Sequence, residues 1–199
     1  MFTKKSSLNL LFIVGPTRSG SSILRKCVER SPKVSKLEFE PHLFYQSVVL
    51  SFNKRFENDK NLQDIISQFE SNVSDDNRLY GAKIALNFGF DSLKWTRIHK
   101  RYPNAKFIFI VRNDIYAMEK SFSKKIAKSI DIGYSKSAYQ SLVESLYTSF
   151  NLFIKDNPGQ GLMLKYESLV SNPREELNRI WEFIDSEVPE KVEDLIRRA

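Results

Sequence analysis

Short apolar runs alternate with longer amphipathic segments along the chain. The runs are bounded by polar or turn-forming residues, so each run predicts a β-strand. Five strands are predicted in this way: Leu10 to Val14, Val34 to Glu38, Tyr80 to Leu86, Phe107 to Val111 and Leu162 to Lys165. Two of these runs, LLFIV and FIFIV, contain no polar position. They indicate central strands that are covered on both faces of a sheet.

The segments between the strands predict helices. Seven are expected: Ser21 to Arg30, His42 to Arg55, Leu62 to Asn72, Leu93 to Arg101, Ile115 to Ser129, Ser135 to Lys155 and Arg174 to Ile184. Strands that alternate with helices typically form a parallel sheet with helices packed on both faces. The sequence therefore predicts a three-layer α/β/α fold around a central parallel sheet, in a single domain that spans residues 1–199.

Composition is that of an ordinary globular protein. The 199 residues suit one domain, 41% of them are apolar and 28% are charged. No stretch of about 18 uninterrupted apolar residues occurs, so no membrane-spanning helix is predicted. Cys27 is the one cysteine of the sequence, which rules out an internal disulfide and favours a reducing compartment. These features predict a cytoplasmic protein without a catalytic thiol.

The charge balance favours anionic ligands. Lys and Arg number 31 against 24 Asp and Glu, for a net charge of +7. Such an excess does not separate a nucleotide from a sulfated glycan, a nucleic acid or a membrane surface. The sequence shows no tight basic run and no recognition motif of nucleic-acid-binding proteins. No nucleic-acid partner is predicted, although a non-catalytic module that binds an anion remains an alternative.

A glycine-containing loop follows the first predicted strand. Gly15, four intervening residues, Gly20 and Ser22 reproduce the GxxxxGK[ST] spacing, but Ser21 replaces the lysine and Arg18 is the only cation in the loop. The backbone N–H groups of such a loop, together with the positive end of the next helix, bind a phosphate. The missing lysine argues against the β- and γ-phosphates of ATP. A P-loop kinase or nucleotide hydrolase remains a second alternative.

Arg112 comes directly after the FIFIV strand. Because ligands of an open α/β sheet lie beyond the carboxyl ends of its strands, Arg112 and the Gly15 to Ser22 loop are expected to face one crevice. The planar guanidinium of arginine suits a phosphate. Two anion-binding segments at one crevice predict a ligand with two phosphates. For Arg112 taken alone, a structural ion pair is the competing interpretation.

Three segments, in order, resemble the PAPS-dependent sulfotransferases. PTRSGSSIL, Pro16 to Leu24, resembles the 5′-phosphosulfate loop of the family, and KFIFIVRN, Lys106 to Asn113, resembles the strand and arginine of its 3′-phosphate site. LKYESLVSNPREELNRIWEFI, Leu164 to Ile184, is similar to the late segment of the family. The resemblance implies a P-loop NTPase-like fold. It also implies 3′-phosphoadenosine 5′-phosphosulfate (PAPS) as cofactor, adenosine 3′,5′-bisphosphate (PAP) as its product, and no metal ion.

The resemblance also assigns the cofactor contacts to residues of this sequence. Those of the loop and the arginine site are Thr17, Arg18, Ser19, Gly20, Ser21, Ser22 and Arg112. The family's usual serine stands eight residues after the arginine, where this chain has Lys120, and Ser121 comes one position later. Lys120 and Ser121 are therefore both predicted to be near the 3′-phosphate, and Ser121 is favoured.

EFEPHLF and YGAKI are further similarities to carbohydrate-type members of the family. They imply Glu40 as general base on the acceptor, with Glu38 and His42 as competing candidates, and Lys83 near the cofactor or substrate. Arg18 is expected to stabilise the leaving phosphate. The predicted function is transfer of a sulfonate group from PAPS to a hydroxyl or amine of a small-molecule or carbohydrate acceptor. The aromatic residues of the Ser135 to Lys155 helix are predicted to belong to the core rather than to an acceptor pocket.

Overall fold

Five parallel strands form one sheet in the computed structural model, which describes residues 8–39, 41–73, 77–86, 94–125, 135–187 and 196. The strands are β1 (Leu10–Pro16), β2 (Val34–Phe39), β3 (Leu79–Leu86), β4 (Lys106–Val111) and β5 (Gly161–Lys165). Their order in the sheet is β2-β3-β1-β4-β5, and every neighbouring pair is parallel. The predicted strands and their parallel arrangement are confirmed.

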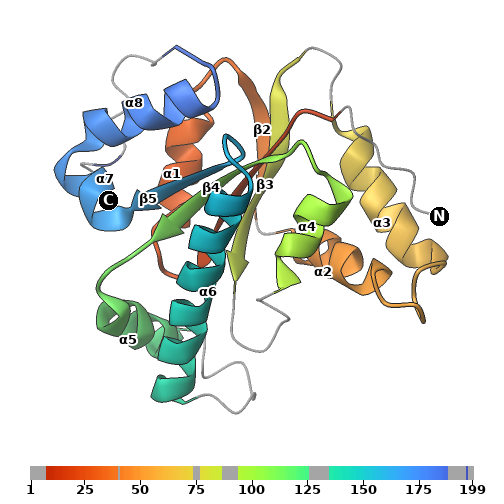
Figure 1. The fold of residues 1–199 in the computed structure, drawn as a ribbon, viewed down its shortest axis with the longest axis horizontal. Coiled ribbons are helices and arrows are strands. Elements are labelled where there is room, and N and C mark those ends of the chain that lie inside the picture. The colour runs from red at the N-terminus through yellow and green to blue at the C-terminus, as the bar shows by residue number, and fades with distance from the viewer. Residues whose placement is uncertain are drawn as a thin grey trace.

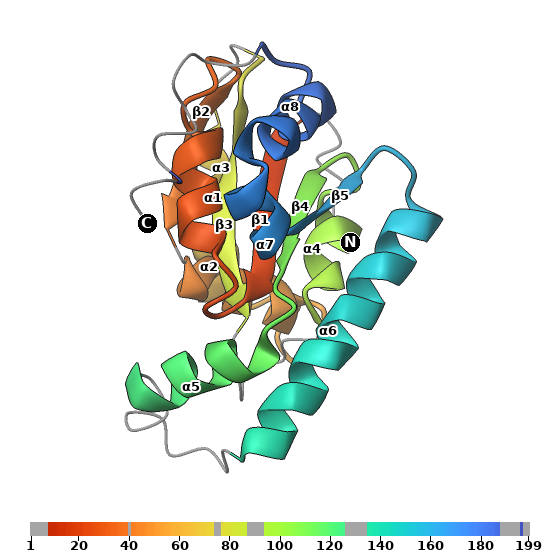
Figure 2. The same ribbon diagram turned by 90° about the vertical axis from the view of Figure 1, so that its left-hand side faces the viewer.

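Helices cover both faces of this sheet (Figures 1 and 2). They are α1 (Ser21–Val28), α2 (His42–Ser51), α3 (Lys60–Ser71), α4 (Thr96–Arg101), α5 (Ile115–Lys125), α6 (Lys136–Asp156), α7 (Tyr166–Ser171) and α8 (Pro173–Phe183). Helices α1, α7 and α8 pack on one face, and α2, α3, α4 and α6 pack on the other. The three-layer α/β/α fold is thereby confirmed. No described helix has the length and apolar character needed to cross a membrane.

Alternate residues of β1 supply the two apolar layers, because successive side chains of a strand point to opposite faces. Leu11 and Ile13 pack with α1 and α8, whereas Phe12 and Val14 pack with the aromatic residues of α2, α3 and α6. All of β1 is buried, as its apolar run predicts. Gly81 of β3 lies directly against β1, since a Cβ at this position would come within 1.8 Å of the Leu11 carbonyl oxygen. Only glycine permits this approach.

Two helical segments differ most from the sequence prediction. Helix α2 ends at Ser51 instead of Arg55, because the Asn53 side chain accepts a hydrogen bond from the Arg55 N–H and stabilises a turn. The short helix α7 was not predicted, since six residues are too few for a helical pattern to be recognised. Parts of the predicted helices Leu93 to Arg101 and Ile115 to Ser129 lie outside the described residues.

The thiol of Cys27 is expected to be unreactive in the folded protein. Cys27 is fully buried on α1, and burial raises the pKa of its thiol to about 11. The thiol therefore stays protonated near neutral pH. It is unreactive there because only the thiolate is a good nucleophile. We expect iodoacetamide at pH 8 to label Cys27 only after guanidinium unfolds the chain, which mass spectrometry can follow. Rapid labelling of the native protein would show that α1 opens readily.

Candidate functional site

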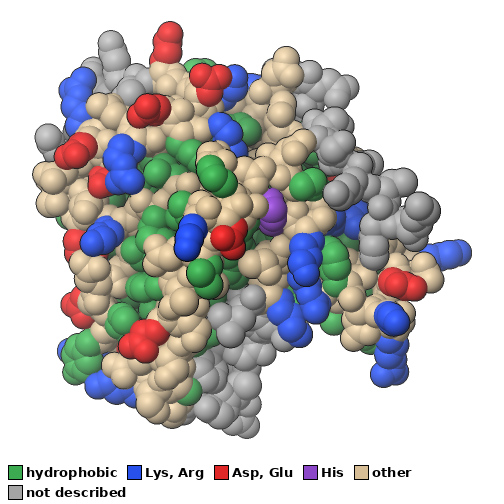
Figure 3. All heavy atoms as spheres, in the orientation of Figure 1, with side chains coloured by type: hydrophobic (Ala, Val, Ile, Leu, Met, Phe, Trp, Pro, Cys, Tyr) green, Lys and Arg blue, Asp and Glu red, His purple; other side chains and the backbone are tan. Residues whose placement is uncertain are grey.

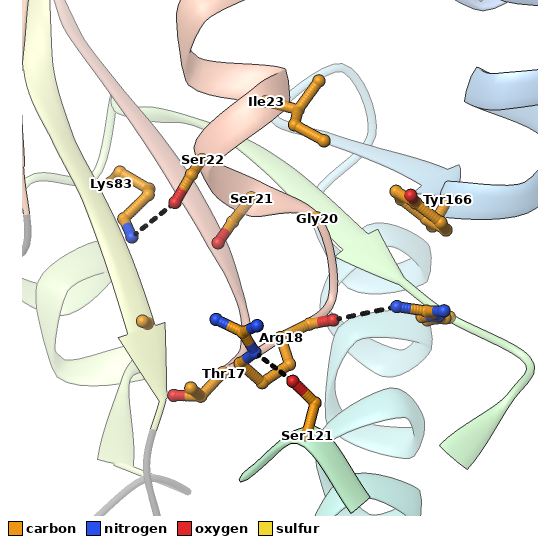
Figure 4. Close-up of a pocket in the computed structure, with 11 residues that line it drawn as sticks. Thr17, Arg18, Gly20, Ser21, Ser22, Ile23, Lys83, Ser121 and Tyr166 are labelled. Carbon is orange, nitrogen blue, oxygen red and sulfur yellow. Dashed lines mark hydrogen bonds between the residues drawn. The ribbon is translucent and has the colours of Figure 1, made fainter. Parts of the chain in front are cut away.

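An open pocket of about 260 Å³ lies at the carboxyl ends of β1, β3 and β4 (Figure 4). Its lining comes from segments far apart in the sequence: Thr17, Arg18, Gly20, Ser21, Ser22, Ile23, Lys83, Ala85, Arg112, Ser121 and Tyr166. β1 stands between β3 and β4, so the connections after β1 and after β4 leave the sheet on different sides. Such a topological switch point is where open α/β sheets bind ligands.

The loop between β1 and α1 forms one wall of the pocket. Arg18 and Gly20 both have left-handed backbone angles, with φ of 74° and 98°. A Cβ on Gly20 would come within 2.4 Å of the Tyr166 ring, so only glycine fits here. Gly20 is also the N-cap of α1 and provides no side-chain cap. The first N–H groups of α1 are therefore available to an anion in the pocket.

Basic and hydroxyl groups from several elements meet in this pocket. Lys83 of β3 is almost fully buried, and its Nζ lies 3.3 Å from the Ser22 Oγ at the start of α1. Arg18 is exposed in the loop, and its Nε donates to the Ser121 Oγ of α5 at 2.7 Å. Figure 4 shows both contacts across the cavity. The arrangement concentrates positive charge and hydrogen-bond donors at one point.

Arg112 reaches the same pocket from the end of β4. Its guanidinium carbon lies 4.7 Å from the ring centroid of Tyr166, a cation–π distance. One of its terminal nitrogens donates to the Arg18 carbonyl at 3.5 Å. The Nε of Arg112 is buried and has no hydrogen-bond partner among the described residues. A buried donor without a partner is unfavourable, so this group is well placed to bind an anion.

The backbone around Arg112 is held by two further side chains. The Tyr147 hydroxyl accepts a hydrogen bond from the Arg112 N–H at 2.7 Å and donates to the Arg112 carbonyl at 2.9 Å. Glu167 accepts from the Asn113 N–H at 3.0 Å. Burial raises the pKa of Tyr147 to about 12, so its hydroxyl remains a donor at neutral pH. The sequence predicted Tyr147 only as a core residue and assigned no role to Tyr166 or Glu167, although both belong to the YES tripeptide of the late segment.

Most predicted cofactor residues line the pocket, and two do not. The lining includes Thr17, Arg18, Gly20, Ser21, Ser22, Arg112 and Ser121. Ser19 has a fully buried side chain turned toward Gly15, and its N–H donates to the Pro16 carbonyl. Lys120 is exposed and is absent from the lining, whereas its neighbour Ser121 faces Arg18. The direct contacts of these residues with a cofactor stay predictions.

The three candidates for the general base are placed differently. Glu38 accepts a hydrogen bond from the Tyr80 hydroxyl at 2.7 Å and does not line the pocket. His42 is exposed at the start of α2 and lines a small hollow that shares Ala85 with the pocket. Glu40 lies outside the described residues. Within the described part of the chain, no group of three or more His, Cys, Asp or Glu side chains could hold a metal ion.

Comparison with known proteins connects this geometry to a family. A model described as the sulfotransferase family matches residues 53–190, which is more than half of the chain. The chain belongs to the sulfotransferase family. The matched region contains β3, β4 and α5, and so includes Lys83, Arg112 and Ser121. It begins after the Arg18 loop, so the assignment of the loop depends on its geometry in the pocket.

Individual sulfotransferases are similar over most of the chain. A protein of Caenorhabditis briggsae named "Putative protein-tyrosine sulfotransferase" is 24% identical over 188 residues, which cover 88% of this chain and 65% of that protein. The chain thus spans slightly less than two thirds of the length of this relative.

Solved structures confirm the fold. The sulfotransferase domain from the curacin biosynthetic pathway has a TM-score of 0.67 at 18% identity, over 93% of this chain and 76% of that domain. A mouse sulfotransferase in complex with PAP has a TM-score of 0.57 at 15% identity, over 96% of this chain and 63% of that one. The P-loop-like sulfotransferase fold predicted from the sequence is therefore confirmed.

Proposed function

We propose that the protein transfers a sulfonate group from PAPS to a hydroxyl or amine of an acceptor. One observation carries the proposal: the loop after β1 and Arg112 after β4 meet in one pocket, joined by the hydrogen bond from Arg112 to the Arg18 carbonyl. Two anion-binding segments side by side suit a nucleotide that has both a 5′ and a 3′ phosphate. Membership of the sulfotransferase family supports this, as does the mouse relative in complex with PAP.

The residues of the pocket fit such a nucleotide. The first N–H groups of α1 and the hydroxyls of Ser21 and Ser22 would hold the 5′-phosphosulfate, because all of them donate hydrogen bonds. Arg112 and Ser121 would hold the 3′-phosphate. The partnerless Nε of Arg112 supports this assignment, since a phosphate oxygen would satisfy it.

Bound PAPS would supply the sulfonate group and the phosphate that leaves. Arg18 would hold its charge beside that phosphate, and Lys83 adds a second, buried positive charge at Ser22. Preorganised charges of this kind stabilise the negative charge that develops in a transition state. Glu40 would accept the proton of the acceptor hydroxyl. Its neighbour in sequence, Pro41, lines the hollow that shares Ala85 with the pocket, which supports this role.

The acceptor can be sought by direct assay. The Caenorhabditis briggsae relative is named for protein tyrosine, so tyrosyl peptides belong in a first screen with radiolabelled PAPS, beside simple phenols, sugars, alcohols and amines. Transfer of label to one of these classes would identify the acceptor chemistry. Absence of any transfer, in protein that binds PAP, would place the acceptor outside these classes.

Replacing Arg112 with alanine tests the cofactor assignment. Calorimetry without magnesium is expected to show selective binding of PAP, and Arg112→Ala should weaken it by about 10- to 100-fold, because a charge-assisted phosphate contact is lost. Binding of AMP, which has no 3′-phosphate, should change little. Arg30→Ala is the matched control, since this exposed arginine at the end of α1 lies outside the pocket.

Titrations of ATP with magnesium and of nucleic acid would recognise two alternatives. Preference for ATP with magnesium would indicate a kinase or nucleotide hydrolase. Binding of nucleic acid that falls steeply with salt, without preference for PAP, would indicate an anion-binding module. On the face shown in Figure 3, acidic and basic side chains are interspersed over much of the described surface, which does not favour a continuous track for a polyanion.

A further inference from the structure

Two tyrosines of α6 have hydroxyl groups that packing does not explain. The ring of Tyr139 is buried against Phe122 of α5, with ring centroids 5.1 Å apart, and the ring of Tyr147 packs against Phe150. A phenylalanine ring would fill the same space. Core positions of the same helix do carry purely apolar side chains, such as Leu146. The two hydroxyls therefore need a separate reason.

Each hydroxyl binds the main chain of one phosphate-binding segment. Tyr139 donates to the Thr17 carbonyl of the loop at 3.1 Å. Tyr147 binds both the N–H and the carbonyl of Arg112, at 2.7 and 2.9 Å. One hydroxyl can bind both groups, because it accepts from the N–H and donates to the carbonyl. The contacts fix the backbone and leave the Arg112 side chain for the pocket.

Helix α6 thus connects the two segments through one rigid element. It is continuous over 21 residues, and the two tyrosines lie eight residues apart, which corresponds to about 12 Å along a helix axis. The same helix packs on α5 through Met118, Phe122 and Val143, and α5 carries Ser121. Figure 2 shows α5 and α6 meeting beyond the carboxyl ends of the strands. Helix α6 therefore holds both segments that would bind the 3′-phosphate, the Arg112 segment and α5 with Ser121.

We propose that Tyr139 and Tyr147 are positioning residues that set the spacing between the 5′ and 3′ phosphate subsites. A fixed spacing selects a nucleotide that carries both phosphates, because small misplacements of binding groups weaken such a fit strongly. The inference depends on the proposed function, since it assumes that the ligand is PAPS or PAP. It assigns the selectivity for that ligand to main-chain contacts made by α6, in addition to the arginines that touch the phosphates.

Conservative substitutions test this role through the ratio of PAP affinity to AMP affinity, which a general loss of stability would not change. Tyr147→Phe should weaken PAP binding about tenfold while AMP binding stays within about twofold, because the lost contacts hold the Arg112 segment and Met118 of α5, and none of them holds the loop. Tyr139→Phe should weaken AMP about fivefold and PAP about tenfold or more, since both ligands use the loop and only PAP depends on the distance between the loop and Arg112. Tyr116→Phe, an exposed position on α5, is the matched control and should leave both affinities unchanged.

The double variant Tyr147→Phe/Arg112→Ala should bind PAP no more weakly than Arg112→Ala, because Tyr147 acts through Arg112. If the losses of PAP affinity from the two substitutions add, Tyr147 does not act through Arg112, and its positioning role is overturned.

Wild-type protein that does not prefer PAP to AMP overturns both the proposed function and this inference. A wild-type preference that persists in Tyr147→Phe, with unchanged binding in Tyr139→Phe, overturns the inference alone. Should Tyr147→Phe fail to fold, Tyr139→Phe tests the other end of the same helix.

Discussion

Glu40→Gln is expected to lower kcat by about 10²- to 10⁴-fold, the usual contribution of a well-placed general base. The amide is nearly isosteric with the carboxylate but cannot accept the proton of the acceptor hydroxyl. Binding of PAP should remain within about twofold of wild type, because no phosphate contact is assigned to Glu40. Turnover of radiolabelled PAPS and calorimetry of PAP measure the two quantities separately.

Glu38→Gln is the matched control for this prediction. The Glu38 carboxylate is engaged by the Tyr80 hydroxyl and lies 3.6 Å from the Lys36 Nζ, so its removal should leave turnover nearly unchanged. Full activity of Glu40→Gln would remove Glu40 from the base role. Loss of turnover in Glu38→Gln, or in His42→Gln, would transfer that role to the corresponding side chain.

Arg18→Ala is expected to lower kcat by about 10²- to 10³-fold, as removal of one preorganised charge from a reacting oxyanion does. Arg18 is the cation of the loop, and its Nε reaches Ser121 across the pocket. Affinity for PAP should fall less than kcat, because the interaction strengthens as charge develops on the leaving phosphate. Single-turnover kinetics with saturating PAPS would measure the chemical step directly.

The backbone of Arg18 requires a second variant. Its φ of 74° lies in the left-handed region, where a Cβ is strained, so alanine keeps the strain that arginine already has and glycine removes it. Arg18→Gly should lose the same turnover although its backbone strain differs, and agreement between the two variants would assign the loss to the side chain beyond Cβ. Lys26→Ala, an exposed position of α1, controls for the loss of one positive charge. Wild-type turnover in Arg18→Gly would contradict the role proposed for Arg18.

The sequence predicted the fold because its apolar runs are unambiguous. LLFIV and FIFIV contain no polar residue and became β1 and β4, the central strands that carry the two anion-binding segments. Parallel strands place their carboxyl ends at one edge, so the meeting of the loop with Arg112 could also be expected before the structure. Ser121 was favoured over Lys120 as a 3′-phosphate contact only because the family usually has a serine near this position. The structure places Ser121 in the pocket.

The rest depended on contacts between distant segments. No local pattern shows that Tyr147 binds the backbone of Arg112, 35 residues away, or that Tyr139 reaches Thr17, 122 residues away. On α6 both tyrosines have the helical spacing of ordinary core residues, and their rings do pack in the core. Tyr166 is likewise close to Gly20 only because β5 lies beside β4.

Local chemistry therefore defined this protein's secondary structure, its parallel sheet and the residue types that bind anions, because strand patterning and loop conformation act over short stretches of chain. The relative placement of those anion-binding groups came from packing. Strand order brings Arg112 to the Arg18 loop, and the hydroxyls of α6 hold both main chains at a fixed separation. Side-chain contacts of this kind join residues that the sequence separates widely, so they exist only once the sheet and its helices have assembled.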